Sequence, residues 1–111
     1  MSLLLVALAA GGLQLDWSAP GACPSRERVT RSVVELYGGD VSSVQLAVTA
    51  TASGPPWTVR LSAASPGGVS RRSLRGESCE ALAEAAAVII AIALSAEAAR
   101  AAEPVEARAA A

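Results

Sequence analysis

The chain has 111 residues, which suits a single domain near the lower end of comfortable core size. Nine basic residues, all arginine, and ten acidic residues give a formal net charge of −1. This balance excludes an overall positive electrostatic potential of the kind that binds nucleic acid. Histidine is absent, which excludes Ser-His-Asp and Cys-His catalysis and the usual zinc ligand sets, so we expect no enzyme activity, metal or cofactor.

The first residues hint at the compartment. Residues 3–10 form a short apolar run, LLLVALAA, in which Ala7, Leu8 and Ala9 match an A-x-A cleavage pattern. The run has the length of a signal-peptide core and is too short to span a bilayer, although the usual basic residues before it are missing. We therefore expect residues 1–12 to be a signal-peptide-like remnant of an exported protein. The alternative is a first β-strand of the folded domain.

The next segments predict a strand and then a helix. Residues 13–17 alternate apolar and polar in LQLDW, as in a short strand. A helix is expected to start within residues 23–27, because Pro24 is tolerated in a first turn and Glu27 complements the positive helix end. Its apolar stripe consists of Val29, Val33, Leu36 and Tyr37. Gly38 and Gly39 supply the stop.

The middle of the chain predicts three strands. Residues 43–51 and 57–63 alternate apolar and polar on either side of the turn residues 53–56, which indicates a β-hairpin. Residues 69–75, VSRRSLR, predict a third and more polar strand at a sheet edge, where arginines discourage pairing with other chains.

A last helix follows, with Ser78 as its N-cap and Glu80 in its first turn. Residues 85–94 are continuously apolar, and Pro104 is expected to end the helix. One face carries Leu82, Ala86, Ile89, Ile90 and Ala93. Because Val88 and Ile92 make the opposite face apolar as well, we expect this helix to be buried more completely than the first.

The element order is (β)-α-β-β-β-α. It predicts an α+β domain over residues 13–102, with a three- to four-stranded antiparallel sheet and two helices packed on one face. Residues 103–111 carry no core pattern and are expected to form a flexible tail or the start of a linker.

Cys23 and Cys79 each fall at a predicted helix start, too far apart for a CxxC redox motif. In an oxidising compartment a well-separated pair favours a disulfide, which here would fasten the two helix starts together. The alternative is a thiolate activated by a helix dipole, for which no neighbouring His or Lys is present.

The apolar helix also allows a membrane interpretation. Its continuous core, residues 85–94, is short against the roughly 20 residues needed to span a bilayer. Glu80, Glu84 and Glu97 bracket it closely, and each is costly inside hydrocarbon. We expect a buried core helix, so membrane insertion is disfavoured.

Four arginines gather on the second and third predicted strands: Arg60, Arg71, Arg72 and Arg75. By the period of two, residues 71 and 75 share a face. Such a cluster can bind an anionic polymer or an acidic partner segment. The commoner explanation is a solvated sheet face that protects an edge. Addition of a partner peptide as an extra strand is compatible with the pattern but not indicated by it.

The motifs WSAPGACP, starting at Trp17, and ESCEALA, starting at Glu77, resemble a set of exported proteins of GC-rich Gram-negative bacteria. In those proteins a W-x-A-P-x-x-C-P start and a C-x-A-L-A apolar helix bracket a small domain, often before a Pro/Ala-rich linker and a further envelope region. The resemblance covers roughly residues 13–94 and implies export and the disulfide, but no activity. This chain departs from the pattern by ending soon after the domain, so we expect a fragment or a missing downstream region.

The sequence as a whole predicts a non-catalytic module of the periplasm or cell envelope that serves interaction or structure. Its partner would be an envelope protein or an anionic polymer. The second hypothesis is a small membrane-associated protein that uses the apolar helix, residues 85–94.

Overall fold

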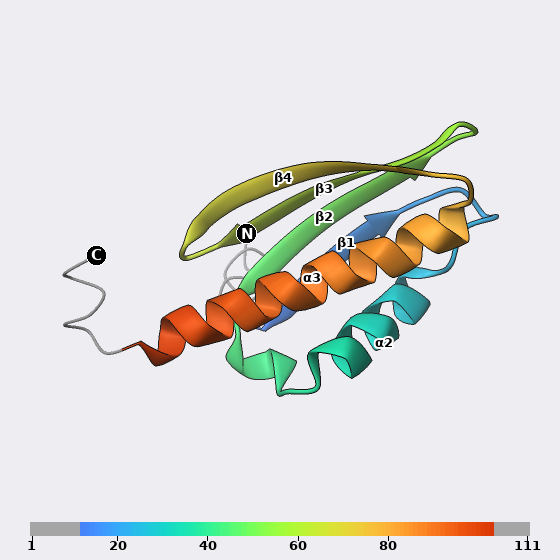
Figure 1. Ribbon diagram of the computed structural model, residues 1–111. Helices are drawn as coiled ribbons and strands as arrows, with labels where there is room; N and C mark the ends of the chain where they lie inside the picture. The colour runs from blue at the N-terminus through green and yellow to red at the C-terminus, as the bar shows by residue number, and fades with distance from the viewer. Residues whose placement is uncertain (1–11, 104–111) are drawn as a thin grey trace, which may run out of the picture.

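The computed structural model describes residues 12–103 (Figure 1). All but one residue of the expected signal-like segment 1–12, and all but one of the expected tail 103–111, therefore lie outside the described part. The elements follow the predicted order: β1 Leu13–Ser18, α2 Arg26–Tyr37, the short 3-10 turn η1 Val41–Ser43, β2 Leu46–Ser53, β3 Trp57–Ser65, β4 Gly68–Gly76 and α3 Cys79–Ala102.

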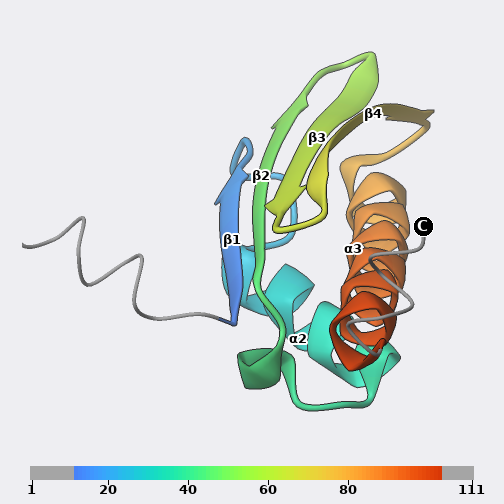
Figure 2. The same cartoon turned by 90° about the vertical axis from the view of Figure 1, so that its left-hand side faces the viewer.

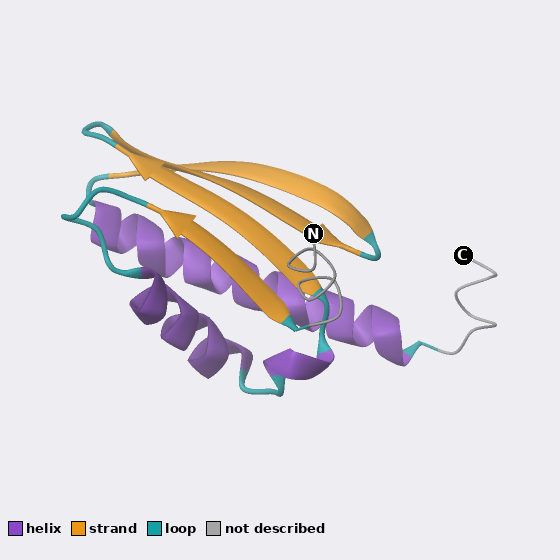
Figure 3. Cartoon of the chain, turned by 180° about the vertical axis from the view of Figure 1, so that it is seen from behind, coloured by secondary structure: helices purple, strands orange, loops and turns teal. Residues whose placement is uncertain are grey.

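The four strands form one sheet in the order β1-β2-β3-β4. The last three strands are antiparallel, as the sequence predicts, whereas β1 runs parallel to β2 (Figure 3). The cause is α2, because a helical crossover returns the chain to the end of the sheet where β1 began. The α+β class is confirmed, and the sheet is mixed rather than wholly antiparallel.

Both helices cover the same face of the sheet, as predicted (Figure 2). The largest fully buried side chains between the layers are Val33 of α2, Val59 of β3, and Ile90 and Leu94 of α3. The core is otherwise built from small aliphatic residues, because the chain has no phenylalanine and many alanines.

Helix α2 ends at Gly38 as its sequence predicts, but Pro24 lies before the N-cap Ser25 and not in the first turn. The Ser25 hydroxyl accepts a hydrogen bond from the Arg28 backbone N–H at 3.2 Å, and Gly38 ends the helix with φ 73°, where a side chain would be strained. Val29 and Val33 are buried. The expected burial of Leu36 is wrong: it is 55% exposed, and Tyr37 packs against the core in the last turn instead.

Helix α3 lies along the middle of the covered face. Ser78 caps it by accepting a hydrogen bond from the Ala81 N–H at 3.1 Å. The predicted burial of its opposite face is wrong, because Val88 is 44% and Ile92 62% exposed. The sheet and α2 cover two sides of α3, and no third layer is present among the described residues to cover the side that carries Val88 and Ile92.

A disulfide joins Cys23, in the loop before α2, to Cys79, the first residue of α3, with a Cα–Cα distance of 5.3 Å. The predicted pairing is confirmed. Trp17 at the end of β1 supports the same loop, because its indole N–H donates a hydrogen bond to the Pro24 carbonyl at 2.8 Å. The tryptophan and the Cys-Pro pair of the sequence motif therefore form one local unit.

Candidate partner-binding surfaces

Both cysteines are consumed in the disulfide, so neither is a thiolate nucleophile. No group of three or more Cys, Asp or Glu side chains in residues 12–103 is placed to hold a metal ion. The remaining candidates are surfaces, and the strand register decides which side chains each surface contains.

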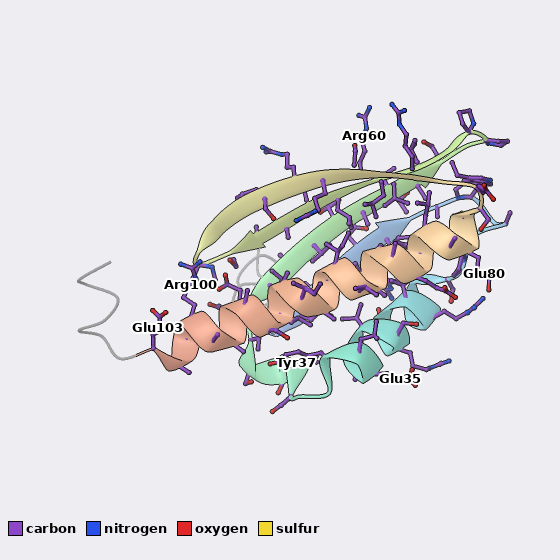
Figure 4. The ribbon with its side chains drawn as sticks, in the orientation of Figure 1. Glu35, Tyr37, Arg60, Glu80, Arg100 and Glu103 are labelled. Carbon is purple, nitrogen blue, oxygen red and sulfur yellow. A yellow bond between two sulfur atoms is a disulfide. The ribbon has the colours of Figure 1, made fainter. Side chains whose placement is uncertain are left out.

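The outer face of the sheet, away from the helices, carries three arginines. Arg60 of β3 lies opposite Ser73 of β4, and Arg71 and Arg75 flank Ser73 by two residues on either side. These three arginines therefore share one face, and we call them the arginine face. Figure 4 shows Arg60 pointing away from the helices.

The spacing within the arginine face follows from sheet geometry. Diagonal neighbours on adjacent strands lie about 7–8 Å apart, so Arg60 sits between Arg71 and Arg75 at about that distance from each. Because residues at alternate positions of an extended chain repeat every 6.6–6.8 Å or so, an extended partner could present one anion to each arginine.

The three arginines are not neutralised within the described part of the chain. None of them makes an ion pair or a side-chain hydrogen bond with another residue of the range 12–103. The surrounding outer surface is made of uncharged hydroxyl side chains: Thr49, Thr51, Thr58, Ser62 and Ser73. Asp16, an acid on the same side, belongs to β1 at the far edge of the sheet.

Arg72 does not belong to this surface. Its cross-strand partner is Leu61, which is buried in the core, so the register turns the Arg72 side chain toward α3. The four arginines predicted as one cluster are thus divided by the sheet, three on the outer face and one on the inner.

A groove of about 470 Å³ lies between β4 and the C-terminal half of α3. We call it the α3–β4 groove. Its walls are mostly apolar and include Leu46, Val48, Leu61, Val69, Ile89 and Ile92. Arg72 also lines it, and its side chain makes no ion pair or hydrogen bond with any other residue of the described chain.

At the end of the groove near the β3–β4 turn, the polar groups are paired. Glu97, whose side chain is 13% exposed, accepts a hydrogen bond from the Ser65 hydroxyl at 2.7 Å. The Arg100 Nε lies 3.6 Å from the same Glu97 oxygen. The two ends of the groove therefore differ, with a neutralised pair at one and the unpaired Arg72 toward the other.

The groove is the feature that sequence reasoning missed. The alternation of residues 69–75 already placed residue 72 on the face opposite 71 and 75, which was the available signal. The curvature of β4 over α3, which opens the space between them, has no signature in the residue pattern (Figure 1).

Comparison with known proteins bears on the fold. No protein-family model matches the chain, and a search of curated proteins found no match. Among solved structures, the crystal structure of the Protein Y N-terminal domain from Thermus thermophilus is similar, with a TM-score of 0.52 and 12% sequence identity. The similarity covers 71% of this chain and 91% of that one. At this identity the likeness concerns the arrangement of strands and helices alone.

Proposed function

We propose that this chain is a non-catalytic domain, exported to the periplasm or cell envelope, that binds an acidic partner segment through its arginine face. The observation that carries the proposal is the presence of Arg60, Arg71 and Arg75 on one side of the sheet without neutralising partners in the described residues. Arginine forms paired, charge-assisted hydrogen bonds with carboxylates, which gives such a surface both affinity and direction.

Edge protection alone explains only part of this surface. Charges on β4, the edge strand, discourage pairing with other sheets, and Arg71 and Arg75 serve that purpose. Arg60 lies on β3, whose two sides are already paired with β2 and β4. An arginine at that position adds nothing to edge protection, and its place between the other two favours a binding role.

Three features support export. The disulfide is consistent with an oxidising compartment, because intracellular thiols are normally kept reduced. Residues 3–10 have the composition of a signal-peptide core. The Trp17 and Cys79 motifs resemble those of exported envelope proteins.

The proposal is tested by titrating the oxidised protein with a fluorescein-labelled oligoglutamate peptide and measuring fluorescence anisotropy. We expect saturable binding that weakens with salt, and a loss of at least tenfold in affinity when Arg60, Arg71 and Arg75 are replaced by Gln. The matched control is Arg31→Gln, which removes an exposed arginine of α2 that makes no ion pair within residues 12–103. Equal affinity of the triple variant and the control would contradict the proposal.

A second candidate function, association with a membrane through residues 85–94, is favoured by one observation. Helix α3 is long and apolar enough to cross a membrane by length and composition, and it leaves Val88 and Ile92 exposed. However, 44% of its most apolar stretch is buried against the rest of the domain. Sedimentation with phosphatidylglycerol vesicles tests this candidate: binding that is lost in Ile92→Glu would favour it, and binding that survives would count against it.

A further inference from the structure

Close approaches between the sheet side and α3 occur at the β3–β4 turn, which lines the α3–β4 groove, and near the start of α3, beyond the groove. A Cβ atom added at Gly76 would lie 2.9 Å from the Leu82 side chain, and one added at Gly67 would lie 2.7 Å from Arg100. The helix between these contacts is about 27 Å long and the strand about 30 Å long, so the two elements bridge the same span. Between the contacts β4 arches away from α3, which leaves the groove open along its side (Figure 1).

The position of the groove limits what can occupy it. A peptide that added to the edge of β4 as a further strand would lie beside the sheet and not between the sheet and α3, so it would leave the groove unfilled. A second copy of the chain would bring its own edge arginines against Arg72 and Arg75 at like charge. The space instead suits a small molecule, and its volume falls within the range of small-molecule sites, about 300–1,000 Å³.

The lining determines the chemistry of that molecule. An apolar body is favoured by Leu61, Ile89 and Ile92, because covering them removes apolar surface from water. An anionic group is favoured by Arg72, the unpaired cation of the wall. At the opposite end, Glu97 repels a second anion, while its pairing with Arg100 and Ser65 leaves no free cation there. One guanidinium matches one carboxylate through two parallel hydrogen bonds.

We infer that the α3–β4 groove is a binding site for a single-chain carboxylate amphiphile, with its carboxylate at Arg72 and its alkyl chain along Ile89, Ile92 and Ala96 toward the β3–β4 turn. This site is separate from the arginine face and does not rest on the acidic-partner proposal, because the sheet lies between Arg72 and the other three arginines. The probe of choice is dodecanoate, used below its micellar concentration.

The isoleucines of the chain offer a selective readout. Ile89, Ile90 and Ile92 are the three isoleucines of the sequence, and all of them line the groove. In oxidised protein with labelled isoleucine δ-methyl groups, each NMR signal therefore reports on this site. We expect dodecanoate to shift these signals saturably, and Ala96→Trp, which fills the groove from an exposed position, to abolish the shift.

Adjacent arginines supply the matched pair of variants. We expect Arg72→Gln to weaken dodecanoate binding at least tenfold, and Arg71→Gln, one residue away on the outer face, to change it less than twofold. For the oligoglutamate peptide the pattern is reversed, so failure of one proposal is distinguishable from failure of the other.

The remaining outcomes decide the identity of the head group. No saturable isoleucine shift with dodecanoate, or equal shifts in Arg72→Gln, would overturn the inference. Equal binding of 1-dodecanol would overturn the role of Arg72, and tighter binding of dodecyl phosphate would overturn the choice of a carboxylate. Weak or absent binding of dodecyltrimethylammonium, a cation of the same chain length, is the expected result.

Discussion

At the scale of single residues, Trp17 connects the sheet to the covalent framework. Its indole N–H bonds to the Pro24 carbonyl, next to Cys23 in the loop that precedes α2. The contact explains why a tryptophan and a Cys-Pro pair belong together in this sequence. It also holds in place the loop that carries Cys23, one half of the disulfide.

We expect Trp17→Phe to lower the free energy of unfolding by about 1 kcal/mol more than the control does, because it removes a partly buried hydrogen bond as well as part of the aromatic ring system. The matched control is Trp57→Phe, since the Trp57 indole makes no hydrogen bond within the described residues. Urea unfolding measures both variants. An equal loss in the two would show that ring size, and not the bond to Pro24, governs the effect.

Asp40 supplies a pH-dependent contact ahead of η1. The Ser42 side-chain hydroxyl and backbone N–H both donate to its carboxylate, and these hydrogen bonds hold the Asp40 pKa below its ordinary value of 3.8. A carboxyl group whose pKa is lower in the folded state than in the unfolded state stabilises the fold at pH values above its unfolded-state pKa. That contribution is lost as the pH falls through the folded pKa.

When the pH is lowered below about 4, we therefore expect the urea concentration at the unfolding midpoint to decrease more for the unaltered protein than for Asp40→Asn. Because Asp40 is exposed, the difference is small, and parallel titrations between pH 6 and pH 2.5 are needed. Asp16→Asn, on β1, serves as the control. Identical pH curves for the protein and Asp40→Asn would refute the role of this carboxylate.

At the scale of elements, α3 has one buried side and one exposed side of similar composition. Leu94 is fully buried and Ile92, two residues earlier, is 62% exposed. We expect Leu94→Ala to destabilise the protein by about 2–5 kcal/mol and Ile92→Ala to change its stability by less than about 0.5 kcal/mol. Thermal and urea unfolding of the two variants measure this. Similar losses would mean that Ile92 is covered in solution.

The same contrast shows what the residue pattern can and cannot predict. The alternation in residues 43–51 and 57–63 predicted the hairpin, and Gly38 and Ser78 marked helix ends, because these signals are local. The exposure of Val88 and Ile92 depends on how many layers surround α3. The parallel pairing of β1 depends on the path of the crossover. Neither is encoded within the segment concerned.

At the scale of the whole molecule, the disulfide is the main covalent constraint on a core built largely from alanine and valine. It closes a loop with a sequence separation of 56, which in the chain-entropy model stabilises the fold by on the order of 4 kcal/mol. That is a large share of the 5–15 kcal/mol or so that is typical of a small domain.

We expect replacement of both Cys23 and Cys79 by Ser to lower the free energy of unfolding by about 2–5 kcal/mol, and reduction of the unaltered protein to have the same effect. Urea unfolding with and without reductant measures both. The double variant should be insensitive to reductant. A protein whose unfolding midpoint does not respond to reductant would contradict the stabilising role of the bond.

The candidate sites were predictable in part. The arginine cluster is visible in the sequence, and its division into an outer set and an inner Arg72 follows from the pairing of β3 with β4. The groove depends on a distance between β4 and α3 that arises from sheet curvature and from the contacts at Gly67 and Gly76. Tertiary geometry of this kind appears only when the layers are assembled.

The placement of the disulfide has a mechanical consequence. The start of β1 and the last turns of α3 lie at one end of the molecule, since Leu13 pairs with Leu46 and Glu97 bonds to Ser65, which is on the strand next to β2 at that end. The Cys23–Cys79 bond lies at the other end, beyond Trp17 (Figure 1). If the chain is pulled at residues 12 and 103, the covalent path between these two points runs through β1, the Cys23–Cys79 disulfide and α3. The segment 24–78, which contains α2 and the β2–β3–β4 meander, lies outside this covalent path, so only the segments 12–23 and 79–103 can be drawn out. While the disulfide is intact, the extension of the domain under load is therefore limited, and reduction would release its full contour length.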